Sequence, residues 1–511
     1  DKNRKVYMEF GIDYNRTFGL HKTTALILYN QSKYYSPSLQ YYVPNAYQGL
    51  VGRLTYEYAS RYLAEFNMGY NGTENFAKGK RFGFFPAVSL GWVISEEKFF
   101  PKNNIVKYLK VRGSYGEVGN DQIGGDRFLY LPSSYGAASD SGVNKYNFGL
   151  ASNPYTSLMI VENKIGNPDL TWEKAKKMNV GVDINLFNNC LTASFDIFKE
   201  KRNNILANRS TSPMIIGANL PAYNFGEMEN RGWEMDLNFR HHIQDFHYWA
   251  RFNYSFARNE IIYMDEVQKR YDYQMTTGRR KNQFFGLIFD GYYNSWEEIN
   301  ALDRPKSSWS GNQLQPGDVK YVDVNQDGVI DDYDMVPIGY TPVPEIIYGF
   351  SFGAQYKGFD FSILFQGADN VSIKYFGRSM WPFAKGEESA KSLIKERWTQ
   401  ERYEAGEKIT FPRLSLNPNG ETDHNYRPST LWIRDASYLR LKNLEVGYTF
   451  TGGFVKRLNL NSVRLYFNGS NLFTWTDVVD LDPEAPSRSG NVEINTYPLQ
   501  KVYNIGLNIN F

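Results

Sequence analysis

Apolar and polar residues alternate along most of this chain, and the alternation is clearest at its end. Tyr503, Ile505, Leu507, Ile509 and Phe511 share one face of an extended segment, and asparagine and glycine occupy the positions between them. A period of two places successive side chains on opposite faces of a β-strand. Large apolar residues on one face and Asn or Gly on the other suit a strand with lipid on one side and water on the other.

The same alternation recurs through the sequence and predicts about 15 strands. Many of these segments contain ten or more residues, whereas strands in globular sheets usually contain about 5–6. The predicted strands cover residues 3–14, 20–33, 49–58, 61–72, 80–94, 106–118, 174–187, 189–204, 229–240, 245–258, 345–356, 359–370, 435–450, 463–472 and 501–511.

Strand length and side-chain distribution together predict an all-β fold, a transmembrane antiparallel β-barrel. Aromatic residues lie near the strand ends, as in the interfacial girdles of such barrels, and the polar faces carry rows of Asp, Glu, Arg and Asn that suit a wetted lumen. A β-sandwich is the alternative, since its strands also alternate, but its strands are shorter. No apolar run reaches the roughly 18 residues that a transmembrane helix needs.

Short and long connections alternate along the chain, and this asymmetry gives the barrel an orientation. Asn188-Asn189, Lys357-Gly358 and residues 241–244 are predicted as tight hairpin links. Outer-membrane barrels have short periplasmic turns and long extracellular loops. The predicted extracellular loops are residues 119–173, 205–228, 261–344, 371–434 and 473–500.

An odd strand count cannot close a bacterial barrel that has an even number of strands and both ends in the periplasm. We therefore expect residues 1–511 to be the C-terminal part of a larger barrel whose remaining strands and plug domain lie outside this sequence. The net charge of +2 argues against a nucleic-acid partner, which usually needs a concentrated basic face. No catalytic set stands out, so the chain is not expected to be an enzyme.

An acidic segment in the loop 261–344 matches a calcium-binding loop of the EF-hand type. Oxygen-bearing side chains occupy positions 1, 3, 5, 9 and 12 of residues 323–334, and Gly328 stands at position 6 for the turn. Position 12 is Asp rather than Glu, which shortens its reach. No flanking helix pair is evident, so calcium would stiffen the loop; an acidic turn without metal is the alternative. The expected ligands are Asp323, Asn325, Asp327, Asp331, Asp334 and the main-chain carbonyl of Val329.

Aromatic residues in the predicted loops are candidates for contacting a substrate. Trp381 and Phe383 follow a strand end closely, and Trp309 lies in the preceding long loop. Such rings stack on sugars or clamp a partner. For any single one of them, packing within the loops is the favoured alternative.

Stretches along nearly the whole chain are similar to the C-terminal barrel region of SusC/RagA-type TonB-dependent transporters of Bacteroidetes outer membranes. Each stretch is weakly specific alone, and their order makes the resemblance specific. They are residues 85–92 (FPAVSLGW), 109–116 (LKVRGSYG), 166–173 (GNPDLTWE), 317–331 (GDVKYVDVNQDGVID), 432–448 (WIRDASYLRLKNLEVGY), 471–475 (NLFTW), 481–484 (LDPE) and 497–499 (YPL).

This resemblance implies a barrel of about 22 strands with an N-terminal plug, of which about 15 strands lie in this chain. It implies import of oligosaccharides or oligopeptides across the bacterial outer membrane, driven through TonB–ExbB–ExbD. A SusD-like surface lipoprotein would cover the extracellular loops as a lid. Two other functions stay open: a passive porin-like channel, and a barrel whose loops bind a surface partner without transport.

Overall fold

The computed structural model describes most of the chain. Each of the five predicted long loops contains residues outside the described part, and Tyr497 and Pro498 are among them. The described residues are 3–37, 39, 43–123, 127–131, 136–137, 145–150, 155–158, 160–161, 165–211, 220–309, 313–375, 381–383, 392–415, 423–479, 481–484, 491–492 and 499–511.

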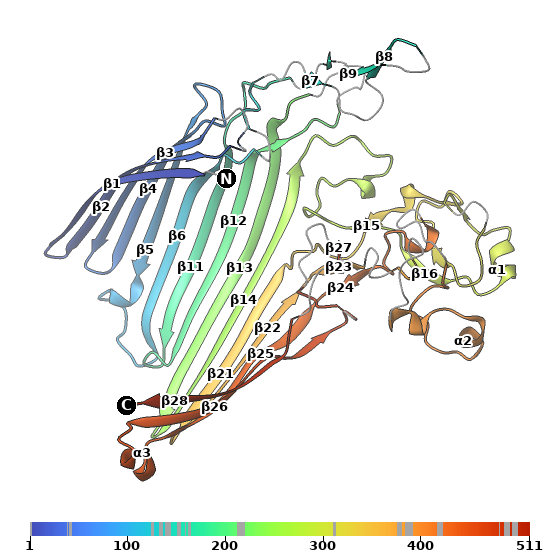
Figure 1. The fold of residues 1–511 in the computed structure, drawn as a ribbon. Coiled ribbons are helices and arrows are strands. Elements are labelled where there is room, and N and C mark those ends of the chain that lie inside the picture. Colours follow the sequence, from blue (N-terminus) through green and yellow to red (C-terminus); the bar gives the residue numbers. More distant parts are fainter. Residues whose placement is uncertain are drawn as a thin grey trace. The chain divides into compact units, whose positions relative to one another are not determined.

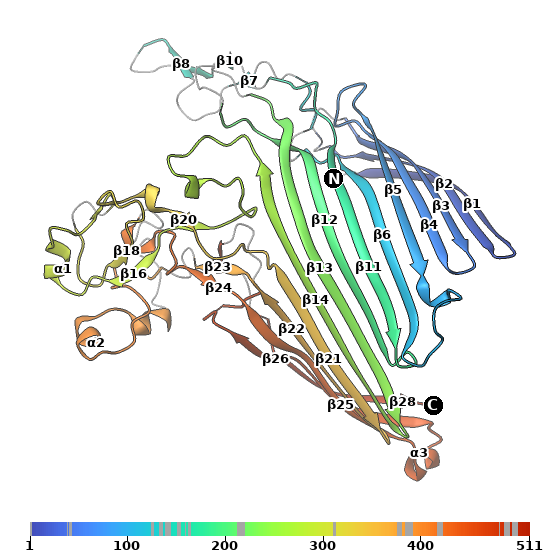
Figure 2. The same cartoon turned by 180° about the vertical axis from the view of Figure 1, so that it is seen from behind.

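Fifteen long strands form one antiparallel sheet in which the strands follow one another in chain order (Figures 1 and 2). Each corresponds to one predicted strand, so the all-β prediction is confirmed. The strands are β1 (Arg4–Phe18), β2 (His21–Tyr35), β3 (Asn45–Tyr58), β4 (Tyr62–Thr73), β5 (Phe82–Val93), β6 (Val106–Asn120), β11 (Glu173–Leu186), β12 (Leu191–Ala207), β13 (Tyr223–Ile243), β14 (Phe246–Tyr263), β21 (Ile346–Tyr356), β22 (Phe359–Asp369), β25 (Tyr438–Phe450), β26 (Ser462–Thr476) and β28 (Val502–Asn510).

The chain divides into two compact units, and the division passes through the four strands β11, β12, β13 and β14. The first unit holds residues 1–184, 196–232 and 259–267, and the second holds 185–195, 233–258 and 268–511. Within the described residues, no helix is long and apolar enough to cross a membrane.

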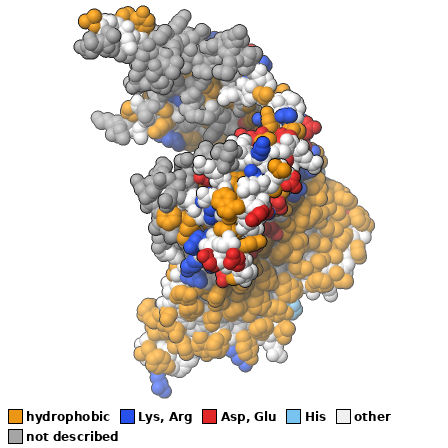
Figure 3. Space-filling model, turned by 90° about the vertical axis from the view of Figure 1, so that its right-hand side faces the viewer, with side chains coloured by type: hydrophobic (Ala, Val, Ile, Leu, Met, Phe, Trp, Pro, Cys, Tyr) orange, Lys and Arg blue, Asp and Glu red, His pale blue; other side chains and the backbone are white. Residues whose placement is uncertain are grey.

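One face of the strands is apolar and exposed in both units. In the first unit Phe10 and Ile12 are 66% and 58% exposed, and in the second Ile505 is 81% exposed. Figure 3 shows hydrophobic side chains covering a broad continuous area, with charged side chains gathered in a separate area. Exposed apolar area of this extent is unusual for a protein surrounded by water and typical of a lipid-facing barrel wall.

The tight links are confirmed at two of the three predicted positions, and the third is displaced. Asn188, Asn189 and Lys357 adopt positive φ angles of 57°, 68° and 44°. The prediction of a link over residues 241–244 was wrong, because β13 continues to Ile243 and the turn is Gln244-Asp245. His241 and His242 therefore belong to β13. The ring centroids of His242 and His247 lie 5.5 Å apart across the hairpin, and the rings stack.

Short strands and helices in the connections form small sheets of their own. These pair as β7 with β10, β8 with β9, β15 with β20, β16 with β18, β17 with β19, and β23 with both β24 and β27. Their bounds are β7 (Gly136–Ala137), β8 (Lys145–Phe148), β9 (Tyr155–Leu158), β10 (Ile160–Val161), β15 (Phe285–Gly286), β16 (Phe289–Tyr292), β17 (Lys306–Ser307), β18 (Val319–Tyr321), β19 (Val329–Ile330), β20 (Val336–Pro337), β23 (Ser372–Tyr375), β24 (Ile433–Asp435), β27 (Asn491–Val492), α1 (Trp296–Asn300), α2 (Gln400–Glu404) and α3 (Gly453–Arg457), with 3-10 turns η2 (Ile94–Glu96), η4 (Asp272–Gln274), η5 (Asp332–Asp334), η7 (Ser392–Glu396) and η9 (His424–Tyr426).

Candidate functional site

The long connections of the second unit share one hydrophobic core, which we call the loop core. It joins the two predicted loops 261–344 and 371–434 with residues that follow β26, so these loops form one packed body. Its buried members are Leu287, Tyr292, Val319, Tyr321, Ile330, Val371, Ile373, Tyr375, Trp381, Trp398, Phe411, Tyr426, Leu431, Trp432, Ala436 and Val478.

Trp381 lies inside the loop core. It is 8% exposed, and its ring centroid lies 5.6 Å from that of Tyr426, which in turn stacks 5.3 Å from Trp432. The neighbouring Pro382 is fully buried. Packing within the loop core therefore explains the burial of Trp381 without a contact to substrate.

The other two predicted substrate residues lie at the margin of the loop core. Trp309 packs against the core, and the guanidinium carbon of Arg427 lies 4.0 Å from its ring centroid. Phe383 is partly exposed and has a φ of +60°, a backbone conformation that is costly for a bulky residue. Strain of this kind is found most often at functional segments, so Phe383 is the strongest of the three candidates for a ligand contact.

The predicted calcium loop has a main-chain path organised by its own side chains. Asp323 Oδ2 accepts a 2.8 Å hydrogen bond from the amide of Gly328, whose φ of +82° glycine adopts without cost. Asn325 Oδ1 accepts from the Asp327 amide, and Asp327 Oδ1 accepts from the Val329 amide, both at 2.9 Å. The sequence therefore folds locally into the turn that an EF-hand loop requires.

Asp334 closes this loop from its far end. The residue is fully buried; its Oδ1 accepts from the Val324 amide at 2.8 Å and its Oδ2 accepts from the Asp331 amide at 2.9 Å. Burial raises the pKa of the Asp334 carboxyl, and the amide hydrogen bonds oppose that rise. Asp331 caps the following 3-10 turn through its side chain.

The fit of a cation to this loop rests on one atom. Asp323 Oδ1 is buried and has no hydrogen-bond partner, and a buried carboxylate oxygen without a partner is costly unless a cation satisfies it. Among the described residues, no three His, Cys, Asp or Glu side chains gather closely enough to hold a metal. All four carboxylates among the expected ligands accept hydrogen bonds from main-chain amides, Asp323 through its Oδ2 atom, so the calcium site stays a prediction.

Ion-pair networks on the polar strand faces are a structural feature that the sequence did not predict. In the first unit, Arg112 contacts Asp196 at 2.6 Å and Asp183 at 3.1 Å. In the second, the Arg464 guanidinium bridges Asp360 and Glu445 across three strands. Rows of charges on the polar faces were visible in the sequence, but cross-strand pairing depends on strand register. Such networks give the lumen face a fixed pattern of charge.

The sequence matches the family described as "TonB dependent receptor-like, beta-barrel" over residues 3–472. TonB-dependent receptor P3 of Formosa agariphila is 28% identical over 479 residues, covering 90% of this chain and 45% of that protein. TonB-dependent receptor SusC of Bacteroides thetaiotaomicron is 28% identical over 477 residues, covering 92% of this chain and 44% of that protein. The chain thus spans less than half the length of these relatives.

The fold is similar to that of a solved structure as well. The RagAB peptide transporter structure superposes with a TM-score of 0.72 at 22% identity, covering all of this chain and 56% of the other. The relatives are receptors rather than enzymes, which confirms the prediction made from the absence of a catalytic set. The chain belongs to the TonB-dependent receptor-like β-barrel family and is an outer-membrane protein.

Proposed function

We propose that this chain is the barrel wall of a SusC/RagA-type importer that moves oligosaccharides or oligopeptides across the outer membrane by TonB-dependent transport. The observation that carries the proposal is the 15-stranded antiparallel sheet in a family of TonB-dependent receptors. Its polar faces carry paired charges such as Arg112 with Asp196. A wetted, charged lumen suits passage of a polar cargo.

The other components of such an importer belong to the whole protein and to its partners. An N-terminal plug and the other barrel strands would close the pore, and TonB–ExbB–ExbD would supply the energy. A SusD-like lipoprotein would cover the loop core as a lid. The loop core supports this part of the proposal, because a packed body presents a defined surface to a partner at lower entropic cost than separate flexible loops.

One experiment on the full-length protein distinguishes active import from a passive channel and from surface binding without transport. Uptake of labelled oligosaccharides and oligopeptides is measured in cells with and without TonB, at equal amounts of the protein in the membrane. Loss of uptake without TonB supports active import. Uptake that persists indicates a passive porin-like channel, and binding without uptake indicates a surface-binding barrel. Mass spectrometry of ligand co-purified with the protein and its lid then separates glycan from peptide.

A structural calcium ion in the loop 323–334 is the second part of the proposal. Asp323, Asn325, Asp327, Asp331 and Asp334 with the Val329 carbonyl would supply the oxygen ligands that calcium prefers. The unpartnered Asp323 Oδ1 and the internal Asx hydrogen bonds support it. In this role calcium would stiffen one side of the loop core and take no part in chemistry.

A further inference from the structure

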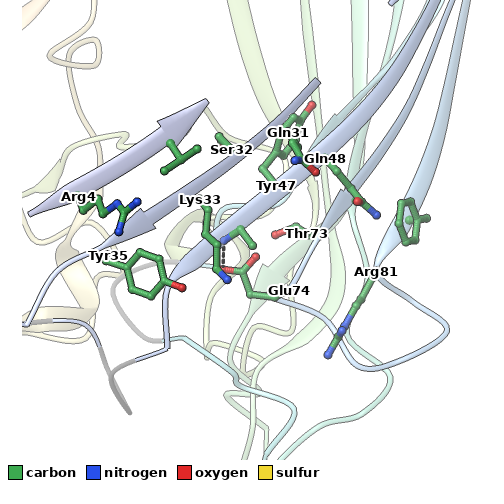
Figure 4. Close-up of a pocket in the computed structure, with 14 residues that line it drawn as sticks. Arg4, Gln31, Ser32, Lys33, Tyr35, Tyr47, Gln48, Thr73, Glu74 and Arg81 are labelled. Atoms are coloured by element: carbon green, nitrogen blue, oxygen red, sulfur yellow. Dashed lines mark hydrogen bonds between the residues drawn. The ribbon is translucent and has the colours of Figure 1, made fainter. Parts of the chain in front are cut away.

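A groove runs across the ends of strands β1 to β5 in the first unit. It encloses about 690 Å³ and is lined by both charged and aromatic side chains. Figure 4 shows Arg4 and Lys33 on neighbouring strands beside Tyr35, with Arg81 at the far end of the groove. None of these residues was predicted to have a function.

Strand register places most of this groove on the apolar face. Val6 pairs with Lys33, and Gln31 pairs with Gln48, so these side chains lie on the same face. Continuing by twos along β1, that face carries Met8, Phe10, Ile12 and Tyr14, all of them exposed. In an outer-membrane barrel the exposed apolar face contacts lipid. The groove therefore opens toward the bilayer rather than toward the lumen.

The groove lies where the apolar band of this face ends. Arg4 and Arg16 are the cations that bracket the band on β1, twelve residues apart. At about 3.3 Å per residue and a tilt of about 40°, this separation spans roughly 30 Å along the membrane normal. The hydrocarbon core of a bilayer is about 30 Å thick. Arg4 is thus at the level of the lipid headgroups.

Three cations line the groove, and no carboxylate in the described part of the chain neutralises them. Among the described residues, Arg4, Lys33 and Arg81 form no ion pair with a carboxylate, and Arg81 Nε donates to the Phe76 carbonyl at 3.1 Å. The acidic lining residue, Glu74, is already paired with Arg127 at 2.8 Å. An anionic ligand would find cations without having to displace a partner.

Neighbouring groups add directional donors. The Tyr29 hydroxyl donates to Gln31 Oε1 at 3.0 Å, which leaves the Gln31 amide NH₂ for a ligand. The Lys33 ammonium lies 5.2 Å from the centroid of the Tyr35 ring, which holds the charge beside an aromatic residue at the interface. Arg and Lys with amide donors are the groups that proteins use to bind phosphate oxygens.

We propose that this groove binds the phosphate-bearing headgroup of a lipid in the outer leaflet, with the acyl chains against Val6 and Phe82. The outer leaflet follows from the predicted orientation, in which the long connections are extracellular. The antiparallel pairing from β1 to β6 places Arg4 at the same edge of the sheet as Asn120, where the predicted extracellular loop 119–173 begins. The inference concerns the contact between barrel and bilayer, and it is independent of cargo, TonB and the lid.

Retention of lipid by the full-length protein tests this site. The protein is purified in mild detergent, and the number of bound lipid A molecules, which carry phosphates, is measured by native mass spectrometry. The test variant is Arg4→Gln with Lys33→Gln. The matched control is Lys5→Gln with Lys22→Gln, which removes the same charge from the same two strands on the opposite face. Arg4→Lys with Lys33→Arg serves as the conservative variant.

We expect about tenfold or greater loss of retained lipid A in the test variant, because the headgroup phosphates would lose two charged hydrogen-bond donors. The control and conservative variants should retain lipid A as the unmodified protein does. Equal retention of dephosphorylated lipid A would overturn the proposal, as would equal loss in the Lys5 and Lys22 control. Displacement of the lipid by low concentrations of inorganic phosphate would show that the groove binds free phosphate, and it would overturn the proposal that the ligand is a lipid.

Discussion

Arg440 of β25 forms an ion pair with Asp482, at 2.8 Å from Nη2 to Oδ1, although Asp482 lies in the connection that follows the next strand, β26. The Arg440 residue is only 1% exposed, and its guanidinium also contacts Glu484 and Thr474. Asp482 Oδ2 in turn accepts from the Leu499 amide at 3.3 Å. One buried cation therefore holds the connection between β26 and β28 against the strands.

Replacing Arg440 with Met should release this connection. The two carboxylates would be left in a poorly solvated place without their cation, and breaking a buried pair from one side costs roughly 3–5 kcal/mol. We expect a lower unfolding temperature and faster proteolysis within residues 477–484, with Arg440→Lys intermediate. The matched comparison is Arg53→Met, whose pair with Glu65 is half exposed and contributes little. Equal effects of the two Met variants would show that burial of Arg440 is unimportant.

The prediction of the sheet from the sequence worked because the signal is local. Residues such as Met8, Phe10 and Ile12 show their common face through spacing alone, and a period of two needs no knowledge of distant partners. Strand ends were less exact where polar residues continue the pairing, as at His241 and His242 in β13. The loop core could not be predicted in the same way, since its segments have no periodicity.

The candidate site shows why long-range contacts escaped prediction. Phe411 packs edge-on against Trp432 at 5.4 Å, and the Arg440 carboxylate partners lie more than forty residues away in sequence. Such pairs come from tertiary packing, and a single sequence does not indicate which distant residues meet. The turn within residues 323–334 is the exception, because its side chains accept hydrogen bonds from main-chain amides only a few residues away and the local sequence therefore determines it.

Calcium should stabilise the loop core if the acidic loop binds it. We expect addition of calcium to raise the unfolding temperature of the protein, since a ligand that binds only the folded state stabilises it by mass action. Asp327→Asn should weaken this shift, and Asp323→Asn should weaken it further. Asp332→Asn is the control, because Asp332 lies in the same segment outside the ligand positions and is largely exposed. A calcium response equal in all four proteins, or none in the unmodified protein, would refute the site.

Trp381 and Phe383 should respond differently to truncation. Removing the buried Trp381 side chain would leave a cavity beside Tyr426, and large-to-small changes of this kind cost about 3–5 kcal/mol. Trp381→Ala should therefore increase proteolysis of the loop core and lower uptake only as far as it lowers the folded amount. Phe383→Ala should leave stability nearly unchanged and reduce uptake per folded molecule. The reverse pattern, with ligand uptake lost in a stable Trp381 variant, would favour direct contact by Trp381.

The loop core should lose stability as the pH falls, because His424 is buried in a neutral form. Its Nε2 donates to the Val319 carbonyl at 2.8 Å, and its Nδ1 accepts from the Ser307 hydroxyl at 2.9 Å. Burial lowers the pKa of His424 below its usual 6.5, more than nearby Asp318 and Asp423 raise it. Both ring nitrogens of the neutral imidazole therefore have a hydrogen-bond partner, and a second ring proton would break the bond from Ser307.

The direction of the pH effect follows from proton uptake. Below pH 6.5 the unfolded chain binds a proton at this histidine while the folded state does not, so stability falls with pH until the folded pKa is reached. The slope should approach about 1.4 kcal/mol per pH unit within that window. Hydrogen exchange of the Val319 and Tyr321 amides at pH 7.5 and 5.5 measures it locally. His424→Gln should remove this part of the pH dependence, and an unchanged slope in that variant would assign the effect to other groups.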